Sequence, residues 1–199
     1  MLINTHHHAG QVMEFVRSLK KRIRIDIDLF YEPVLKGSGG TVFANRRFVS
    51  DEKDFIIAYA DNLTDVDFSK MIGFHHRICV ANGGCLTMGV RRAANPSGLG
   101  IAVLDDNDRI VSFVEKSKNP LGDMANCGIY VASREIFDFF PSDAKSGNDP
   151  KDRNFAAIDF GYHILPSLAG RMYGYRIREY LVDIGTPESY KKALDSYKH

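Results

Sequence analysis

The chain has 199 residues, of which 44% are hydrophobic and 26% are charged, which is enough for one globular domain with a substantial core. Twenty-six basic and twenty-five acidic residues leave a formal net charge of +1, which argues against nucleic acid or a membrane surface as a partner. No apolar run approaches the ~18 residues of a membrane span, and the polar, histidine-containing start is unlike a signal peptide. We therefore expect a cytoplasmic protein.

Strand-like and helix-like segments alternate along the chain, which predicts an α/β fold with a Rossmann-like, mixed but mostly parallel sheet and flanking helices. Apolar residues at helical spacing indicate a helix over residues 8–20, and the alternation in Ile23–Leu29 predicts a strand with one packed face. The segment Gly37–Gly40 precedes an expected helix over 41–48. The apolar run Phe55–Tyr59 predicts a central strand that is buried on both faces and ends just before Asp61.

The second half of the chain continues as one domain, so we expect a single domain over residues 1–199. Acidic turn residues at 105–108 separate two apolar runs and predict a hairpin of 101–104 with 110–114. Pro187 after Thr186 marks the first position of a last helix. The other expected elements are helices over 67–76, 133–139 and 159–168, strands over 86–91, 126–132, 172–177 and 180–184, and a polar surface loop over 142–153.

Two aspartates each follow an apolar strand and precede a turn or helix. Asp61 stands in Ala60-Asp61-Asn62, and Asp183 is followed by Ile184-Gly185-Thr186-Pro187. The carboxyl ends of strands are where open α/β sheets bind their ligands. Two carboxylates brought together there suit Mg²⁺, which completes its shell with waters and phosphate oxygens. A single Asp at such a place is more often a cap or turn residue, so the prediction depends on the pair.

The order of several short motifs resembles the sugar-1-phosphate nucleotidylyltransferases, within the branch of the mannose-1-phosphate and heptose-1-phosphate guanylyltransferases. The resemblance covers nearly the whole chain. It rests on Asn4-Thr5-His6-His7, Glu32-Pro33, Gly37-Ser38-Gly39-Gly40-Thr41, Ala60-Asp61-Asn62, Phe113-Val114-Glu115-Lys116, Asn126-Cys127-Gly128-Ile129-Tyr130, Gly170 to Tyr175, and Asp183 to Tyr190.

The resemblance implies that a sugar 1-phosphate and a nucleoside triphosphate are converted into a nucleotide sugar and pyrophosphate with the help of Mg²⁺. Asp61 and Asp183 match the catalytic metal ligands, and Asp61 also belongs to the nucleotide site. Glu32 and Gly37 match positions that touch the base, and a carboxylate that accepts guanine's N–H groups favours GTP. Glu115, Lys116, Asn126 and Gly128 match the sugar-phosphate site, where carboxylate–hydroxyl and ammonium–phosphate pairs are favourable.

One departure from the family pattern concerns the start of the chain. The family begins with a strand and a glycine-rich loop that holds the triphosphate, and the sequence from Met1 contains neither. This difference predicts an N-terminally truncated domain that lacks its first strand and exposes unpaired backbone groups, which association into a homo-oligomer would cover. The alternative to an enzyme is a catalytically inactive relative that binds a sugar phosphate or nucleotide sugar, or acts as a partner subunit. Ala60 and Ser117 are smaller departures that remove no charge.

Overall fold

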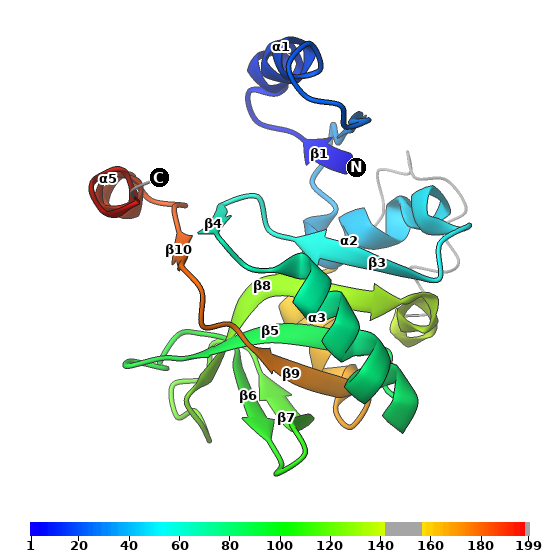
Figure 1. Ribbon diagram of the computed structural model, residues 1–199, viewed down its shortest axis with the longest axis vertical. Helices are drawn as coiled ribbons and strands as arrows, with labels where there is room; N and C mark the ends of the chain where they lie inside the picture. Colours follow the sequence, from blue (N-terminus) through cyan, green and yellow to red (C-terminus); the bar gives the residue numbers. More distant parts are fainter. Residues whose placement is uncertain (142–156, 198–199) are drawn as a thin grey trace.

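A computed structural model describes residues 1–141 and 157–197, and the expected loop over 142–153 lies outside them. A six-stranded sheet forms the centre, in the order β3-β8-β5-β9-β7-β6 (Figure 1). Its strands are β3 (Asp54–Ala58), β5 (Leu86–Arg92), β6 (Ile101–Leu104), β7 (Arg109–Val114), β8 (Met124–Ser133) and β9 (Met172–Arg176). Two further two-stranded sheets pair β1 (Leu2–Thr5) with β2 (Asp28–Tyr31) and β4 (Asn62–Thr64) with β10 (Leu181–Asp183).

Helical segments cover both faces of the central sheet. On one face, α3 (Phe68–Phe74) and the turn η2 (His75–Cys79) cover a cluster that includes Met71 and Ile129. On the other, α2 (Gly37–Ala44), η5 (Phe160–Ile164) and η6 (Leu165–Leu168) enclose the larger cluster around Leu86, Tyr130 and Phe160. The remaining helical segments are α1 (Ala9–Leu19), η1 (Arg46–Val49), η3 (Val80–Asn82), η4 (Arg134–Phe139) and α5 (Pro187–Ser196). This arrangement confirms the predicted α/β class with a mixed sheet.

The expected dominance of parallel pairing is wrong for the described residues. Five of the six pairings in the central sheet are antiparallel, and only β5 with β9 is parallel. Parallel neighbours need a long crossover, which is usually a helix. The predicted β6–β7 hairpin is present, and β6 also pairs antiparallel with β8, so β7 and β8 run in the same direction without being neighbours.

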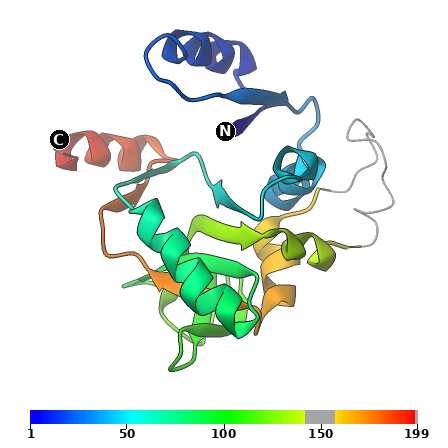
Figure 2. The same ribbon diagram turned by 45° about the vertical axis from the view of Figure 1, so that its right-hand side comes forward.

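Two local expectations also differ from the structure. Only the last two residues of the strand expected over Ile23–Leu29 lie in β2, which continues to Tyr31. The chain is still leaving α1 at Ile23, whose N–H donates to Leu19 O, and β1 offers partners only from Asp28 onward. β3 is not buried on both faces: Ile56 is 41% exposed, and within the described residues β3 pairs with β8 alone. Figures 1 and 2 show β1, α1 and β2 standing apart from the central sheet. The absent first strand and the single truncated domain stay predictions.

Candidate functional site

The two predicted metal-ligand aspartates lie together. Asn62 of β4 and Asp183 of β10 are register partners, and Ile184 N donates to Asp61 O at 2.8 Å. A Cβ atom built on Gly185 would lie 2.9 Å from Asp183 Oδ1 and 3.2 Å from Asp61 Oδ2, so both carboxylates reach the same small space. Gly185 N also donates to Asp183 Oδ1 at 2.7 Å. The β4–β10 ladder therefore brings together two residues that are more than a hundred positions apart in the sequence.

This pair fits Mg²⁺ in its donor chemistry. Mg²⁺ is usually held by one or two carboxylates, with waters and substrate phosphates filling the remaining positions. Both aspartates are exposed, which leaves room for those further ligands. Among residues 1–141 and 157–197, no group of three or more His, Cys, Asp or Glu side chains is placed to hold a metal ion. The geometry thus suits a metal shared between two carboxylates and a phosphate substrate better than a metal enclosed by protein ligands.

Glu115 and Lys116 follow β7 and lie against η5. The Glu115 carboxylate fits between two glycines: a Cβ on Gly161 would lie 2.6 Å from its Oε2, and one on Gly100 would be closer still. Burial, followed by repulsion from Asp159, raises the pKa of Glu115 against the opposing effect of Lys116. Lys116 has a φ of +52°, a strained conformation for a residue with a Cβ. Its Nζ lies 5.9 Å from the centre of the Tyr162 ring.

Asn126 and Gly128 lie where the register of β8 with β5 shifts, beside the Asp61 loop. Gly128 has a φ of +65°, and a Cβ there would lie 2.7 Å from the Tyr59 ring, so only glycine fits without strain. Asn126 Oδ1 accepts from Gly128 N at 3.0 Å, and its Nδ2 donates to the Tyr130 hydroxyl at 2.7 Å. Tyr59 N donates to Gly128 O at 2.9 Å. The predicted sugar segment and the end of β3 thus lie in direct contact.

Glu32 is positioned differently from the other predicted residues, because it is fully buried. Its Oε1 accepts from the Thr41 hydroxyl at 2.5 Å and its Oε2 accepts from Lys36 N at 3.3 Å. These contacts attach the β2 exit to α2. Gly37, with a φ of +75°, packs on Ile158, whose carbonyl oxygen would lie 2.6 Å from an added Cβ. Glu32 therefore stabilises the connection between β2 and α2. Contact of Glu32 and Gly37 with the base stays a prediction.

Several polar residues at this site were not singled out by the sequence. Ser38 Oγ donates to Asp159 Oδ2 at 3.2 Å and accepts from Phe160 N at 2.8 Å. The Tyr59 hydroxyl contacts Ser38 and Tyr130, and burial raises the pKa of Tyr59. The only feature of the sequence that could have indicated one of these residues is the position of Ser38 within the glycine-rich segment 37–40. The tyrosines belong to apolar strand runs and carry no pattern that separates them from core residues.

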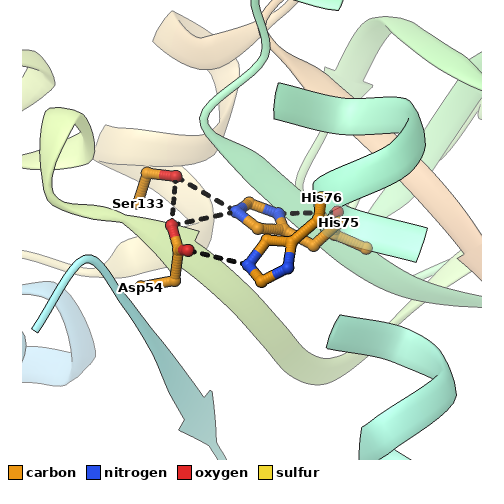
Figure 3. A network of polar contacts seen from close by, with 5 residues as sticks. Asp54, His75, His76 and Ser133 are labelled. Carbon is orange, nitrogen blue, oxygen red and sulfur yellow. Dashed lines mark hydrogen bonds and ion pairs between the residues drawn. The ribbon is translucent and has the colours of Figure 1, made fainter. Parts of the chain in front are cut away.

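A second polar cluster lies at the other end of β3 (Figure 3). Ser133 Oγ donates to Asp54 Oδ1 at 2.7 Å, and His75 Nε2 lies 3.0 Å from Ser133 Oγ. Because the hydroxyl proton points to Asp54, Nε2 must be the donor, which leaves His75 Nδ1 to accept from Thr87 Oγ1 at 2.9 Å. Burial lowers the pKa of His75, so its 3.4 Å approach to Asp54 is a contact of a neutral ring at neutral pH. This cluster anchors α3 and η2 to β3 and β8.

A groove of about 940 Å³ lies at that same end of the molecule. Its lining mixes cations such as Arg47 and Arg134 with anions such as Glu52 and Glu135, and it includes none of the predicted site residues. This groove is therefore not the candidate site. The candidate site consists of the exposed Asp61 and Asp183, the half-buried Ser38 and Glu115, and the buried backbone of Gly128.

Comparison with known proteins identifies the family. The family model described as nucleotidyl transferase matches residues 1–199. The chain belongs to this family. It is 30% identical to a glucose-1-phosphate adenylyltransferase of Fervidobacterium nodosum over 78% of this chain and 36% of that protein. It is 24% identical to the mannose-1-phosphate guanylyltransferase catalytic subunit beta of Dictyostelium discoideum over 99% of this chain and 51% of that protein. The chain thus spans about a third to a half of these relatives.

Solved structures agree with the family fold. HddC from Yersinia pseudotuberculosis superposes with a TM-score of 0.73 at 21% identity, covering 99% of this chain and 78% of that one. A putative glucose-1-phosphate thymidylyltransferase from Bacillus anthracis superposes with a TM-score of 0.78 at 17% identity, covering 100% and 77%. At these identities the likeness concerns the fold. Within the described residues, no helix is both long and apolar enough to cross a membrane.

Proposed function

We propose that this chain carries the metal and sugar-phosphate portions of a sugar-1-phosphate nucleotidyltransferase, which forms a nucleotide sugar and pyrophosphate. The observation that carries the proposal is the convergence of Asp61 and Asp183 on the space beside Gly185. These two carboxylates would hold Mg²⁺, which neutralises phosphate charge and polarises the phosphoryl group when bound. The family membership independently supports the same reaction class.

The reaction breaks the bond between the α-phosphorus and the bridging oxygen of the triphosphate and forms a bond from a sugar-phosphate oxygen to that phosphorus. Such transfer depends mostly on positioning and charge neutralisation. We assign Lys116 to the phosphate of the sugar 1-phosphate and Glu115 to the sugar hydroxyls, because ionised groups make the stronger hydrogen bonds with these partners. Asn126 and Gly128 would contact the sugar, and Gly37 and Asp61 the nucleotide, while the buried Glu32 would support the nucleotide segment through Thr41 and Lys36 N.

We further propose a guanine nucleotide as the donor. Support comes from the sequence resemblance and from relatives such as the putative mannose-1-phosphate guanyltransferase of Sulfolobus acidocaldarius, 30% identical over 64% of this chain. Relatives that are adenylyltransferases are matched equally well, so the base is decided by comparing GTP with ATP. Glu32 contributes little to this choice, because its carboxylate is buried and already accepts two hydrogen bonds.

The test is Mg²⁺-dependent release of pyrophosphate from GTP and mannose 1-phosphate, with ATP and glucose 1-phosphate run in parallel. The chain is assayed as it stands and with a family-type strand and glycine-rich loop joined before Met1. Activity that requires both substrates and Mg²⁺ in either form supports the enzyme. If both forms bind GDP-mannose but release no pyrophosphate, the non-catalytic alternative is favoured. Absence of both binding and turnover in both forms would refute the proposal.

A further inference from the structure

Ser38 physically joins the segment assigned to the nucleotide with the segment that supports the sugar-phosphate residues. It is the second residue of α2, directly after Gly37. Its hydroxyl donates to Asp159 Oδ2 at 3.2 Å and accepts from the buried Phe160 backbone N–H at 2.8 Å. The same hydroxyl contacts the Tyr59 side chain, which packs over Gly128. One small polar side chain therefore connects its own segment to two other parts of the chain.

Asp159 extends this connection to the sugar-phosphate residues. Its Oδ1 accepts from Tyr162 N at 2.9 Å, so the carboxylate holds the start of η5 with one oxygen and Ser38 with the other. η5 carries Gly161, which packs against the Glu115 carboxylate, and Tyr162, whose ring lies beneath the Lys116 ammonium. The position of both charged residues thus depends on a turn whose first residue is held by Ser38.

The backbones of the two segments are also in close contact. Ile158 N donates to Lys36 O at 2.8 Å, and Gly40 N donates to Ile158 O at 2.9 Å. A Cβ on Gly39 would lie 3.0 Å from the Ile158 side chain, so no side chain separates α2 from this strand-like segment. Figure 2 shows α2 beside the yellow-orange segment that leads into η5. Displacement of the α2 start must therefore be transmitted to residues 158–162.

We propose that Ser38 is a positioning residue that couples nucleotide binding to sugar-phosphate binding, an inference that rests on the proposed function. A nucleotide that immobilises the start of α2 also orders Asp159 and η5 through Ser38. The sugar phosphate then binds to Glu115 and Lys116 residues that are already ordered, so it binds more tightly. The coupling is reciprocal, because each ligand must raise the affinity for the other by the same factor.

The experiment measures this factor by calorimetry on the full chain with Mg²⁺. The dissociation constant of mannose 1-phosphate is determined without nucleotide and with saturating guanosine 5′-(α,β-methylene)triphosphate, whose bridging carbon prevents turnover. We expect the wild-type chain to bind the sugar phosphate at least about 5-fold more tightly with the nucleotide, the lower end of typical coupling. In Ser38→Ala the ratio should fall to about 1, and Ser38→Thr, which keeps the hydroxyl, should restore it.

Ser50→Ala is the matched control, because Ser50 Oγ donates only to exposed Asp51 and touches neither ligand segment. A lower melting temperature of Ser38→Ala with an unchanged affinity ratio would show a purely structural role and overturn the inference. A wild-type chain that binds both ligands without coupling would overturn it as well, while leaving the proposed function intact. Failure of both forms of the chain, as it stands and with the joined strand and loop, to bind either ligand would refute both proposals together.

Hydrogen exchange on the wild-type chain gives a second test that needs no variant. The amides of Phe160 and Tyr162 donate to Ser38 and Asp159. Saturation with the nucleotide analogue alone should slow their exchange by at least about threefold, whereas the amides of Asn107 and Arg109, in the turn at the far end of the β6–β7 hairpin from Glu115, should be unaffected. Equal exchange of Phe160 and Tyr162 with and without nucleotide would contradict coupling through Ser38, even if Ser38→Ala does not fold.

Discussion

The carboxylates of Asp61 and Asp183 flank a single glycine, with Asp183 Oδ1 at 2.9 Å and Asp61 Oδ2 at 3.2 Å from the position that a Gly185 Cβ would occupy. Asp183 is the last residue of β10, and Asp61 directly precedes β4, its partner in the short ladder. Because that ladder aligns Asn62 with Asp183, the preceding residue Asp61 is delivered to the same end of the sheet. The assignment of these two aspartates as metal ligands can therefore be tested by two independent substitutions, Asp183→Asn and Gly185→Ala.

Asp183→Asn should reduce Mg²⁺-dependent turnover by at least about 100-fold, because one metal carboxylate is lost. The substitution hardly changes the volume of the side chain. The side chain is exposed and Asn Oδ1 can still accept from Gly185 N, so the melting temperature should change by less than about 2 °C. Pyrophosphate release and thermal unfolding measure the two effects in the active form of the chain. Unchanged turnover would disprove the metal assignment.

Gly185→Ala should weaken Mg²⁺ dependence without removing a carboxylate. The added methyl group would press on both oxygens, and the metal concentration for half-maximal activity should rise by about 10-fold. Gly10→Ala is the matched control, since a Cβ at Gly10 has no atom within 4 Å. A normal Mg²⁺ titration of Gly185→Ala would mean that the two carboxylates do not share an ion at this place.

Glu115→Gln should raise stability while it impairs sugar-phosphate binding. Burial raises the pKa of Glu115 in the folded chain, so the ionised form is disfavoured by folding and its penalty is present at pH values above the usual carboxyl pKa. A neutral amide removes that penalty, and the melting temperature at pH 7 should rise by about 1–2 °C. The KM for mannose 1-phosphate should increase about 10-fold or more, because the charged acceptor is lost.

The raised pKa of Glu115 also predicts how sugar-phosphate binding depends on pH. Wild-type affinity for mannose 1-phosphate should fall as the pH is lowered towards the raised pKa of Glu115, and Glu115→Gln should show a flatter dependence. The stability difference between the two proteins should shrink in the same range, because protonation removes the penalty. A variant that is less stable than wild type at pH 7 would show that Glu115 is stabilised by contacts that outweigh its burial.

The sequence predicted elements whose pattern is complete within one segment. The β6–β7 hairpin, β8, β9 and α5 all have local signals, such as the turn at 105–108 and the Thr186–Pro187 start. The sequence-based predictions were wrong where strand pairing with distant segments determines the structure. An apolar run such as Phe55–Tyr59 shows that a strand is possible but says nothing of its neighbours, and β3 pairs on one side only within the described residues. Strand direction likewise depends on connections, which residue patterns describe poorly.

The candidate site shows the same division. Asp61 and Asp183 were predicted as a pair from their places after apolar runs, and the structure brings them together. Ser38 and Asp159 were not predicted as site residues, because their importance lies in a contact across 121 positions of sequence, and Tyr59 was not because it belongs to an apolar strand run. Glu32 illustrates the reverse case. A carboxylate beside a proline looks exposed in the sequence, whereas tertiary packing buries it and satisfies it with Thr41 and Lys36 N.

The buried His75 predicts acid sensitivity of the fold between pH 7 and pH 5. Burial holds the pKa of His75 below its usual value near 6.5, so the unfolded chain takes up the proton first. The contribution of His75 is therefore fully present above about pH 6.5 and is lost as the pH falls towards its folded pKa. Although burial alone would raise the pKa of Asp54, hydrogen bonds from Ser133 and His76 lower it, so a second loss follows below about pH 4.

His75→Gln should have a lower melting temperature at pH 7 but a smaller drop on acidification. The fall between pH 7 and pH 5 should shrink by about 2–4 °C, which is the change that ~1 kcal/mol produces in a domain of this size. His7→Gln is the control, because His7 is exposed and its removal should leave the drop unchanged. Since β3 runs from Asp54 towards Asp61, turnover should decline over the same pH interval in wild type and less in His75→Gln. An identical drop in melting temperature for His75→Gln and wild type would show that His75 is not the group whose protonation weakens the fold.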